Sequence, residues 1–166
     1  MVAPHSSTIG TSQSKTAPGG APIVGKGGEP SDGPGPEIMS ASTLDGDKVV
    51  NSASEDLGKI EDIMLDVTAG RIAYAVLSFG GFLGMGDKLF AIPWSALTLD
   101  VANKCFVLDV PKERLENAPG FDKDHWPAMA DRSWASEVHA YYEVSPYWDE
   151  RLEVRQDPRR SNPSAS

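Results

Sequence analysis

The sequence predicts an all-β fold: a small barrel of about six strands, with a short C-terminal helical extension and disordered tails. Residues 57–108 contain short segments rich in Val, Ile, Leu and aromatic side chains, separated by Gly, Asp and Asn, which is typical of strands and turns. One segment, residues 71–79, is apolar on both faces, as is a strand covered on both sides. We therefore expect a closed barrel with this segment as an interior strand.

Composition divides the chain into four parts. Residues 1–36 are dominated by Gly, Pro, Ser, Thr and Ala, and residues 151–166 are similarly poor in bulky apolar side chains. Such segments cannot bury enough surface to offset the entropy lost on ordering, so we expect both to be disordered tails. Between them we expect a barrel domain over residues 37–117, and a loop and a helix packed on the barrel over residues 118–150.

The barrel domain begins with two expected strands. The first, residues 48–51, follows a turn at residues 45–47. The second runs from about residue 57 to residue 67, and its alternation favours one core face and one mixed face. The expected core face carries Ile63, Leu65 and Val67, and the mixed face carries Ile60, Asp62, Met64 and Asp66. Gly70 then permits a tight reversal.

The strand at residues 71–79 has an outer face that must itself be covered. Ile72, Tyr74 and Val76 lie on one face, and the alternating residues of the other face are equally apolar. In a small barrel this outer cover comes either from another element of the chain or from another molecule. The pattern is the first indication of a partner surface, and it makes Tyr74 a candidate contact.

The glycine-rich loop at residues 80–87 carries three large apolar side chains, Phe82, Leu83 and Met85. One interpretation is that the loop folds back and caps the end of the barrel. The other is that it is exposed and binds a partner, because an exposed apolar patch usually marks an interface. The glycine spacing lacks the Gly-Lys-Ser/Thr ending of a phosphate-binding loop, so nucleotide binding is not predicted here.

Two further strands complete the predicted barrel. Residues 88–94 form one, with Pro93 at its end or edge because proline cannot donate to a ladder. After a turn at residues 102–104, residues 105–110 return as the other, and residues 111–117 begin with proline and predict one helical turn.

The C-terminal part of the ordered chain differs in kind. Residues 118–129 predict an irregular loop that carries Trp126. A short helix follows, capped by Asp131 or Ser133. Its apolar stripe at helical spacing predicts a clamp against the barrel and consists of Trp134, Val138 and Tyr141.

Charge argues against nucleic-acid binding by the barrel. Residues 37–150 contain nine Lys and Arg against twenty Asp and Glu, a net charge of −11 within a whole-chain charge of −9. Because phosphate backbones are bound through Lys and Arg, a domain this acidic repels them. A protein partner or a homodimer is the expected association, with no direct contact to nucleic acid.

The chain shows no sign of an oxidising or membrane environment. Cys105 is the single cysteine, so no intramolecular disulfide can form, and its place in an apolar strand predicts a small buried side chain. No apolar run has the length of a membrane span, and the N-terminus does not resemble a secretory signal. We expect a cytoplasmic protein.

The residues that carry chemistry are scattered. The histidines are His5, His125 and His139, and none has the ligand spacing of a metal site. Ser, His and Asp are present, but no nucleophile-elbow pattern brings them together. We therefore predict no catalytic residue, no cofactor site and no metal site.

The order and spacing of several short segments resemble the PRC-barrel domain. They are Leu57-Gly58-Lys59-Ile60, then Asp66, Gly70 and Arg71 around the hairpin, Val76-Leu77-Ser78-Phe79, and Phe90-Ala91-Ile92-Pro93-Trp94 followed by Leu97. The extension from Pro119 to Tyr142 looks like that of stand-alone bacterial members. The family supplies the cytoplasmic domain of the photosynthetic reaction centre H subunit and the C-terminal domain of a ribosome-maturation factor. In both it acts as a docking module, although neither specific role is expected to carry over.

The resemblance implies a non-enzymatic protein-interaction module, of which a homodimer is the simplest form. The expected contact residues are Tyr74, Phe82, Leu83, Met85 and Trp126. Two alternatives remain open at this point. One is a ribosome-assembly factor that binds a ribosomal protein, and the other is a small-molecule or metal-dependent enzyme.

Overall fold

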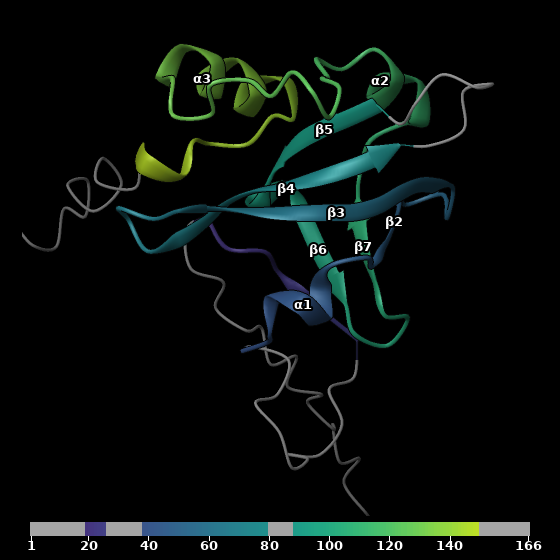
Figure 1. Cartoon of the computed structure of the whole chain (residues 1–166). Coiled ribbons are helices and arrows are strands. Elements are labelled where there is room, and N and C mark those ends of the chain that lie inside the picture. The colour runs from purple at the N-terminus through teal and green to yellow at the C-terminus, as the bar shows by residue number, and fades with distance from the viewer. Residues whose placement is uncertain (1–18, 26–37, 80–87, 150–166) are drawn as a thin grey trace, which may run out of the picture.

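A computed structural model of the chain describes residues 19–25, 38–79 and 88–149 (Figure 1). The fold is mostly β sheet with a few short helices, which confirms the predicted fold class. The strands are β1 (Ile23–Val24), β2 (Lys48–Val50), β3 (Asp56–Asp66), β4 (Arg71–Phe79), β5 (Lys88–Pro93), β6 (Leu97–Asp100) and β7 (Cys105–Leu108). The helices are α1 (Ala41–Leu44), α2 (Lys112–Glu116) and α3 (Arg132–Tyr141), with 3-10 turns η1 (Trp94–Ala96) and η2 (Tyr147–Asp149).

The described strands form one curved sheet in the order β1-β6-β7-β2-β3-β4-β5. The pairs β2–β3, β3–β4, β4–β5 and β6–β7 are antiparallel, whereas β2 pairs with β7, and β1 with β6, in parallel. In Figure 1 the β6–β7 pair runs steeply, at a large angle to β3 and β4, which gives the sheet its barrel-like shape. The expectation of a closed barrel was wrong, because no ladder joins β5 to β1 within the described residues. The chain leaves β5 at Pro93, which has no N–H to donate, and turns through η1.

A continuous apolar core lies inside the curved sheet. β4 contributes to this core along most of its length, and every residue from Ala73 to Phe79 is buried, as the doubly apolar pattern predicts. Aromatic side chains meet edge to face, with ring centroids 6.3 Å apart for Phe79 and Phe90 and 5.6 Å apart for Trp94 and Phe106. The largest fully buried side chains include Leu57, Ile60, Leu77, Phe90, Ile92, Leu97, Phe106 and Leu108.

The predicted faces of β3 were wrong. Ile60, assigned to the mixed face, is buried with 1% of its surface exposed, whereas Leu65 is 62% exposed. Val67, just past the end of the strand, is 88% exposed. The pairing of β3 with β4 shifts register between Ile60 and Asp62 and again between Met64 and Leu65. At the first irregularity the extra residue is Glu61 of β3, and at the second it is Ala73 of β4. The extra residue in β3 moves the side chains that follow it to the opposite face.

The chain before the barrel contains a short strand. Ile23 and Val24 pair with β6, and Ile23 packs against the core. The interpretation of residues 1–36 as one disordered segment did not anticipate this strand. α1 follows and contributes Leu44, which is buried, to the core.

The outer face of β4 is covered by the chain's own C-terminal elements, with α3 lying across β4 and β5 in Figure 1. The ring centroid of Tyr74 lies 5.5 Å from that of Trp134, 5.5 Å from that of His139 and 6.5 Å from that of Tyr147. Asp131 caps α3 by accepting a hydrogen bond from the Ser133 N–H at 2.8 Å. The cover that the sequence required therefore comes from within the molecule.

The face that α3 presents to the barrel is rotated slightly from the predicted stripe. Val138 is buried as expected, but Trp134 and Tyr141 are only half-buried. The buried set is Ala135, Val138, His139 and Tyr142.

Hydrogen bonds fasten this cover at both ends. Near α2, Arg114 Nη2 donates to the Tyr141 carbonyl oxygen at 2.6 Å, and the Tyr141 hydroxyl donates back to the Arg114 carbonyl. At the β3–β4 hairpin, the Tyr147 hydroxyl donates to Asp66 Oδ2, and Arg71 Nη1 donates to the Tyr147 carbonyl, each at 2.9 Å. The two attachments hold α3 and η2 over the outer face of the sheet.

In the described part of the chain, no helix combines the length and the apolar character that a membrane crossing requires.

Candidate protein-interaction surface

The loop that carries Trp126 is fixed to the edge strand β5. The Leu89 N–H donates to the Phe121 carbonyl and the Phe121 N–H donates to the Leu89 carbonyl, both at 2.8 Å. This isolated antiparallel bridge places the start of the loop beside the first residues of β5. A loop anchored in this way presents its side chains from a defined position on the barrel.

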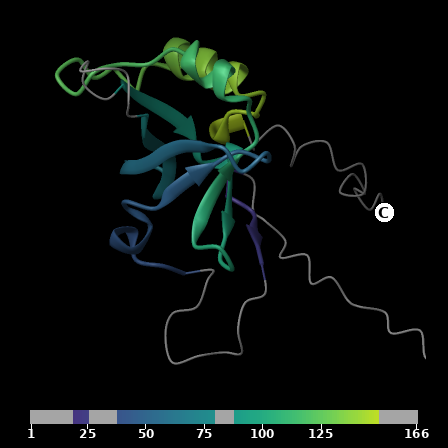
Figure 2. The same cartoon turned by 90° about the vertical axis from the view of Figure 1, so that its right-hand side faces the viewer.

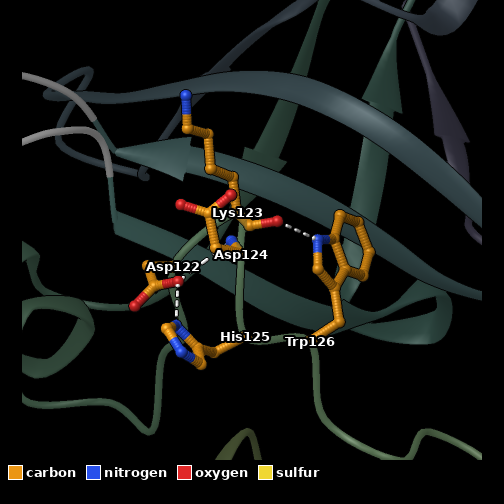
Figure 3. Close-up of polar contacts among 5 residues, drawn as sticks. All are labelled: Asp122, Lys123, Asp124, His125 and Trp126. Carbon is orange, nitrogen blue, oxygen red and sulfur yellow. Dashed lines mark hydrogen bonds and ion pairs between the residues drawn. The ribbon is translucent and has the colours of Figure 1, made fainter.

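Trp126 is held in place but remains 42% exposed. Its indole Nε1–H donates to the Lys123 carbonyl at 2.9 Å, as Figure 3 shows. The ring also packs against Phe121, with centroids 5.0 Å apart and planes inclined by 54°. The one polar group of the indole is thus satisfied within the loop, and an oriented apolar surface is left open.

Acidic groups border this aromatic surface. Asp122 Oδ1 accepts hydrogen bonds from His125 Nδ1 at 2.7 Å and from the Asp124 N–H at 2.9 Å (Figure 3). These donors, with the His125 side chain first, hold the pKa of Asp122 below its usual value. Asp122 is therefore ionised at neutral pH, and the imidazole serves to orient it. The side chains of His125 and Asp122 are 82% and 62% exposed, so this pair lies on the surface.

The glycine-rich loop begins and ends next to this surface. β4 ends at Phe79, which pairs with Lys88 at the start of β5, and Leu89 is bridged to Phe121. The expected contacts Phe82, Leu83 and Met85 themselves lie outside the described residues.

Tyr74, the remaining expected contact, does not lie on a surface. It is 1% exposed beneath Trp134, His139 and Tyr147. Burial raises the pKa of its hydroxyl strongly, and that hydroxyl has no hydrogen-bond partner among the described residues. A partner cannot reach Tyr74 in this structure, so the prediction that it is a contact has no support. The sequence does not show that residues sixty positions later cover it.

Reasoning from sequence missed an exposed apolar pair at the opposite end of β4. Leu65 and Val67 at the β3–β4 hairpin are among the most exposed large apolar residues that the structure describes. Strict alternation had assigned both to the core. The available signal was the turn beginning after Asp66, because a residue next to a hairpin turn usually lies beyond the core.

The groups that carry chemistry stay apart. His139 is buried, and its Nδ1–H donates to the Ala135 carbonyl at 2.7 Å. Cys105 is buried, and burial raises the pKa of its thiol, which disfavours the reactive thiolate. Within residues 19–25, 38–79 and 88–149, no three His, Cys, Asp or Glu side chains are grouped as metal ligands are.

Comparison with known families gives one match: residues 36–115 match the family model of the PRC-barrel domain. No curated protein matches the sequence. The matched residues run from before β2 through most of α2. The Trp126 loop and α3 lie beyond them, so the candidate surface combines an edge of the matched domain with an extension of the chain.

Proposed function

Residues 36–115 match the PRC-barrel domain, and from that match we propose that this chain is a non-enzymatic protein-docking module. PRC-barrel domains are in general small interaction modules without catalysis. The docking surface that we propose is the end of the barrel formed by residues 121–126 and the start of β5. The single observation that carries the proposal is the oriented, half-exposed Trp126 ring.

The position of Trp126 suits an anchor for a partner. Binding energy at protein interfaces is concentrated in a few residues, among which Trp is enriched. A ring already fixed by the Lys123 carbonyl and by Phe121 loses little conformational freedom when a partner covers it. The same ring buried in the core would give no such surface.

Charge indicates the chemistry of the partner. Asp122 and Asp124 belong to the same loop as Trp126, and residues 37–150 carry a net charge of −11. Opposite charges speed encounter and select partners, so the surface suits a protein segment that combines an apolar side chain with Lys or Arg. The same charge opposes docking to phosphate backbones.

A second copy of this chain is the weaker candidate for the partner. The homodimer was expected to cover the outer face of β4, and α3 with η2 already covers that face. We therefore propose a different protein as the partner. Light scattering over a hundredfold concentration range tests this choice: a constant monomer mass agrees with it, and a dimer mass contradicts it.

The docking surface is tested by affinity capture from the native cell extract, comparing wild type with Trp126→Ala. We expect the variant to recover the specific partner at least about tenfold less well, because a central aromatic anchor is lost. Val67→Ala is the matched control, since it removes an even more exposed apolar side chain at the hairpin. Equal recovery by wild type and Trp126→Ala would overturn the proposed surface.

A further inference from the structure

The edge of β6 is covered by a strand of only two residues. β1 runs parallel to β6, with Ile23 opposite Leu99 and Val24 opposite Asp100 (Figure 2). The Leu99 N–H donates to the Pro22 carbonyl at 2.8 Å, and the Val101 N–H donates to the Val24 carbonyl at 3.1 Å. This edge lies on the side of the barrel away from α3.

The side chains of this short strand show what the edge recognises. Ile23 points inward and packs against the core, whereas Val24 is 45% exposed. Gly25 follows with φ +99°, and a Cβ atom there would lie 2.9 Å from the backbone nitrogen of Ala102. The edge of β6 therefore accepts an aliphatic residue at the position of Ile23, any residue at that of Val24, and glycine at that of Gly25.

The chain's own segment uses only part of the edge. β6 begins at Leu97, but the ladder with β1 starts at Leu99. Pro22 precedes the paired residues and has no backbone N–H to donate to the edge. An extended segment without proline at this place can pair along more of β6 and make at least one further hydrogen bond.

We propose that the β6 edge is a strand-addition site for an extended segment of a partner protein with the pattern aliphatic–any–Gly. In the structure Pro22–Gly25 of the chain itself occupies the site. Adding a strand to a sheet edge is a common mode of peptide recognition, in which the ladder supplies affinity and side-chain pockets supply specificity. Residues 26–37 connect β1 to α1, so the displaced strand stays tethered and competes with the partner.

The experiment uses a peptide with the sequence of residues 19–27 in which Pro22 is replaced by Val. It is titrated into isotopically labelled full-length chain while the amide signals of Leu99 and Val101 are followed by NMR. Ile23→Ser weakens the chain's own strand, so we expect this variant to bind the peptide about 10- to 100-fold more tightly than wild type. Val24→Ser is the matched control and should bind as wild type does, because Val24 faces outward.

Amide hydrogen exchange gives an independent readout. The Leu99 and Val101 amides should exchange faster in Ile23→Ser than in wild type, and saturation with the peptide should restore their protection. A peptide that carries Ile23→Asp should neither bind to the Ile23→Ser chain nor restore the protection of these amides. If Ile23→Ser does not fold, Gly25→Val displaces the strand through its contact with Ala102 and replaces it in both measurements.

Two results would overturn the proposal. One is equal peptide affinity for wild type and for a variant with a displaced strand. The other is a wild-type dimer that becomes a monomer in Ile23→Ser, which would show that the edge takes the same segment from a second copy. The first result leaves the Trp126 surface untouched. The second would also contradict the choice of a different protein as the docking partner, but capture by Trp126→Ala still tests the Trp126 surface separately.

Discussion

Two tyrosines, one in the C-terminal cover and one beneath it, show that a hydroxyl group can either stabilise or destabilise the folded state. The Tyr147 hydroxyl donates to Asp66 and joins η2 to the β3–β4 hairpin. The Tyr74 hydroxyl lies deeper and has no partner among the described residues. A hydrogen bond that forms in the folded state adds modestly to stability, whereas a buried hydroxyl without a partner destabilises the folded state because it has lost its hydration.

Replacing each tyrosine by phenylalanine separates these effects. We expect Tyr147→Phe to lower the free energy of unfolding by about 1 kcal/mol, and Tyr74→Phe to leave it unchanged or raise it by up to about 1 kcal/mol. Urea unfolding of both variants and wild type, followed by tryptophan fluorescence, provides the measurement. A larger loss for Tyr74→Phe than for Tyr147→Phe would contradict this account of the cover.

Asp66 makes the same contact sensitive to pH. The Ala69 N–H and the Tyr147 hydroxyl donate to it and hold the pKa of its carboxyl below the usual value. The stabilisation is therefore fully present above the ordinary carboxyl pKa of about 3.9 and is lost as the pH falls through the lowered pKa of the folded state.

A carboxyl titration by NMR checks this assignment. We expect the pKa of Asp66 to rise toward its ordinary value in Tyr147→Phe. Tyr141→Phe is the control, because that hydroxyl donates to the Arg114 carbonyl and has no contact with Asp66. The same Asp66 pKa in wild type and Tyr147→Phe would show that the Tyr147 contact does not form in solution.

At the scale of the element, local pattern predicted strands well and predicted their faces less well. The bounds of β4 follow from its apolar run and the turn at Gly70, both of which are local signals. The predicted faces of β3 were wrong because the register of its pairing with β4 shifts twice. Alternation within β3 alone does not show these shifts. β1 was missed because two apolar residues among Gly and Pro become a strand only through the β6 edge.

One close approach between β3 and β4 gives a prediction for these elements. Gly58 has φ +123°, and a Cβ atom there would lie 2.1 Å from the Ser78 carbonyl oxygen. We expect Gly58→Ala to lower the free energy of unfolding by more than about 3 kcal/mol, because the two strands must separate.

Gly70→Ala is the matched control for this prediction. Gly70 also has positive φ, +67°, but a Cβ atom there meets open space, so we expect a loss of only about 1 kcal/mol. Chemical denaturation of the two variants measures the difference. Losses of equal size would mean that backbone conformation, and not the contact with Ser78, explains the need for glycine.

At the scale of the whole molecule, the sheet is open and curved, and the chain supplies its own outer layer over β4. The residues that cover β4 come from 134–148, beyond the part that matches the PRC-barrel domain. That long-range contact explains why the sequence made Tyr74 a candidate contact although the residue is buried. The exposure of Trp126 was predictable, since a tryptophan in a loop of Pro, Gly and Asp has no strand or helix to bury it.

The docking surface that we propose lies at one end of the barrel, where the extension meets β5. The most direct test is site-specific photo-crosslinking in cells, with a photoreactive amino acid at position 126 of the full-length chain and, in a second variant, at position 137. Glu137 is exposed on α3 and serves as the matched position. We predict a discrete protein adduct from position 126 that is absent from position 137. Adducts of equal yield from both positions, or none from position 126, would contradict the claim that this surface binds a partner.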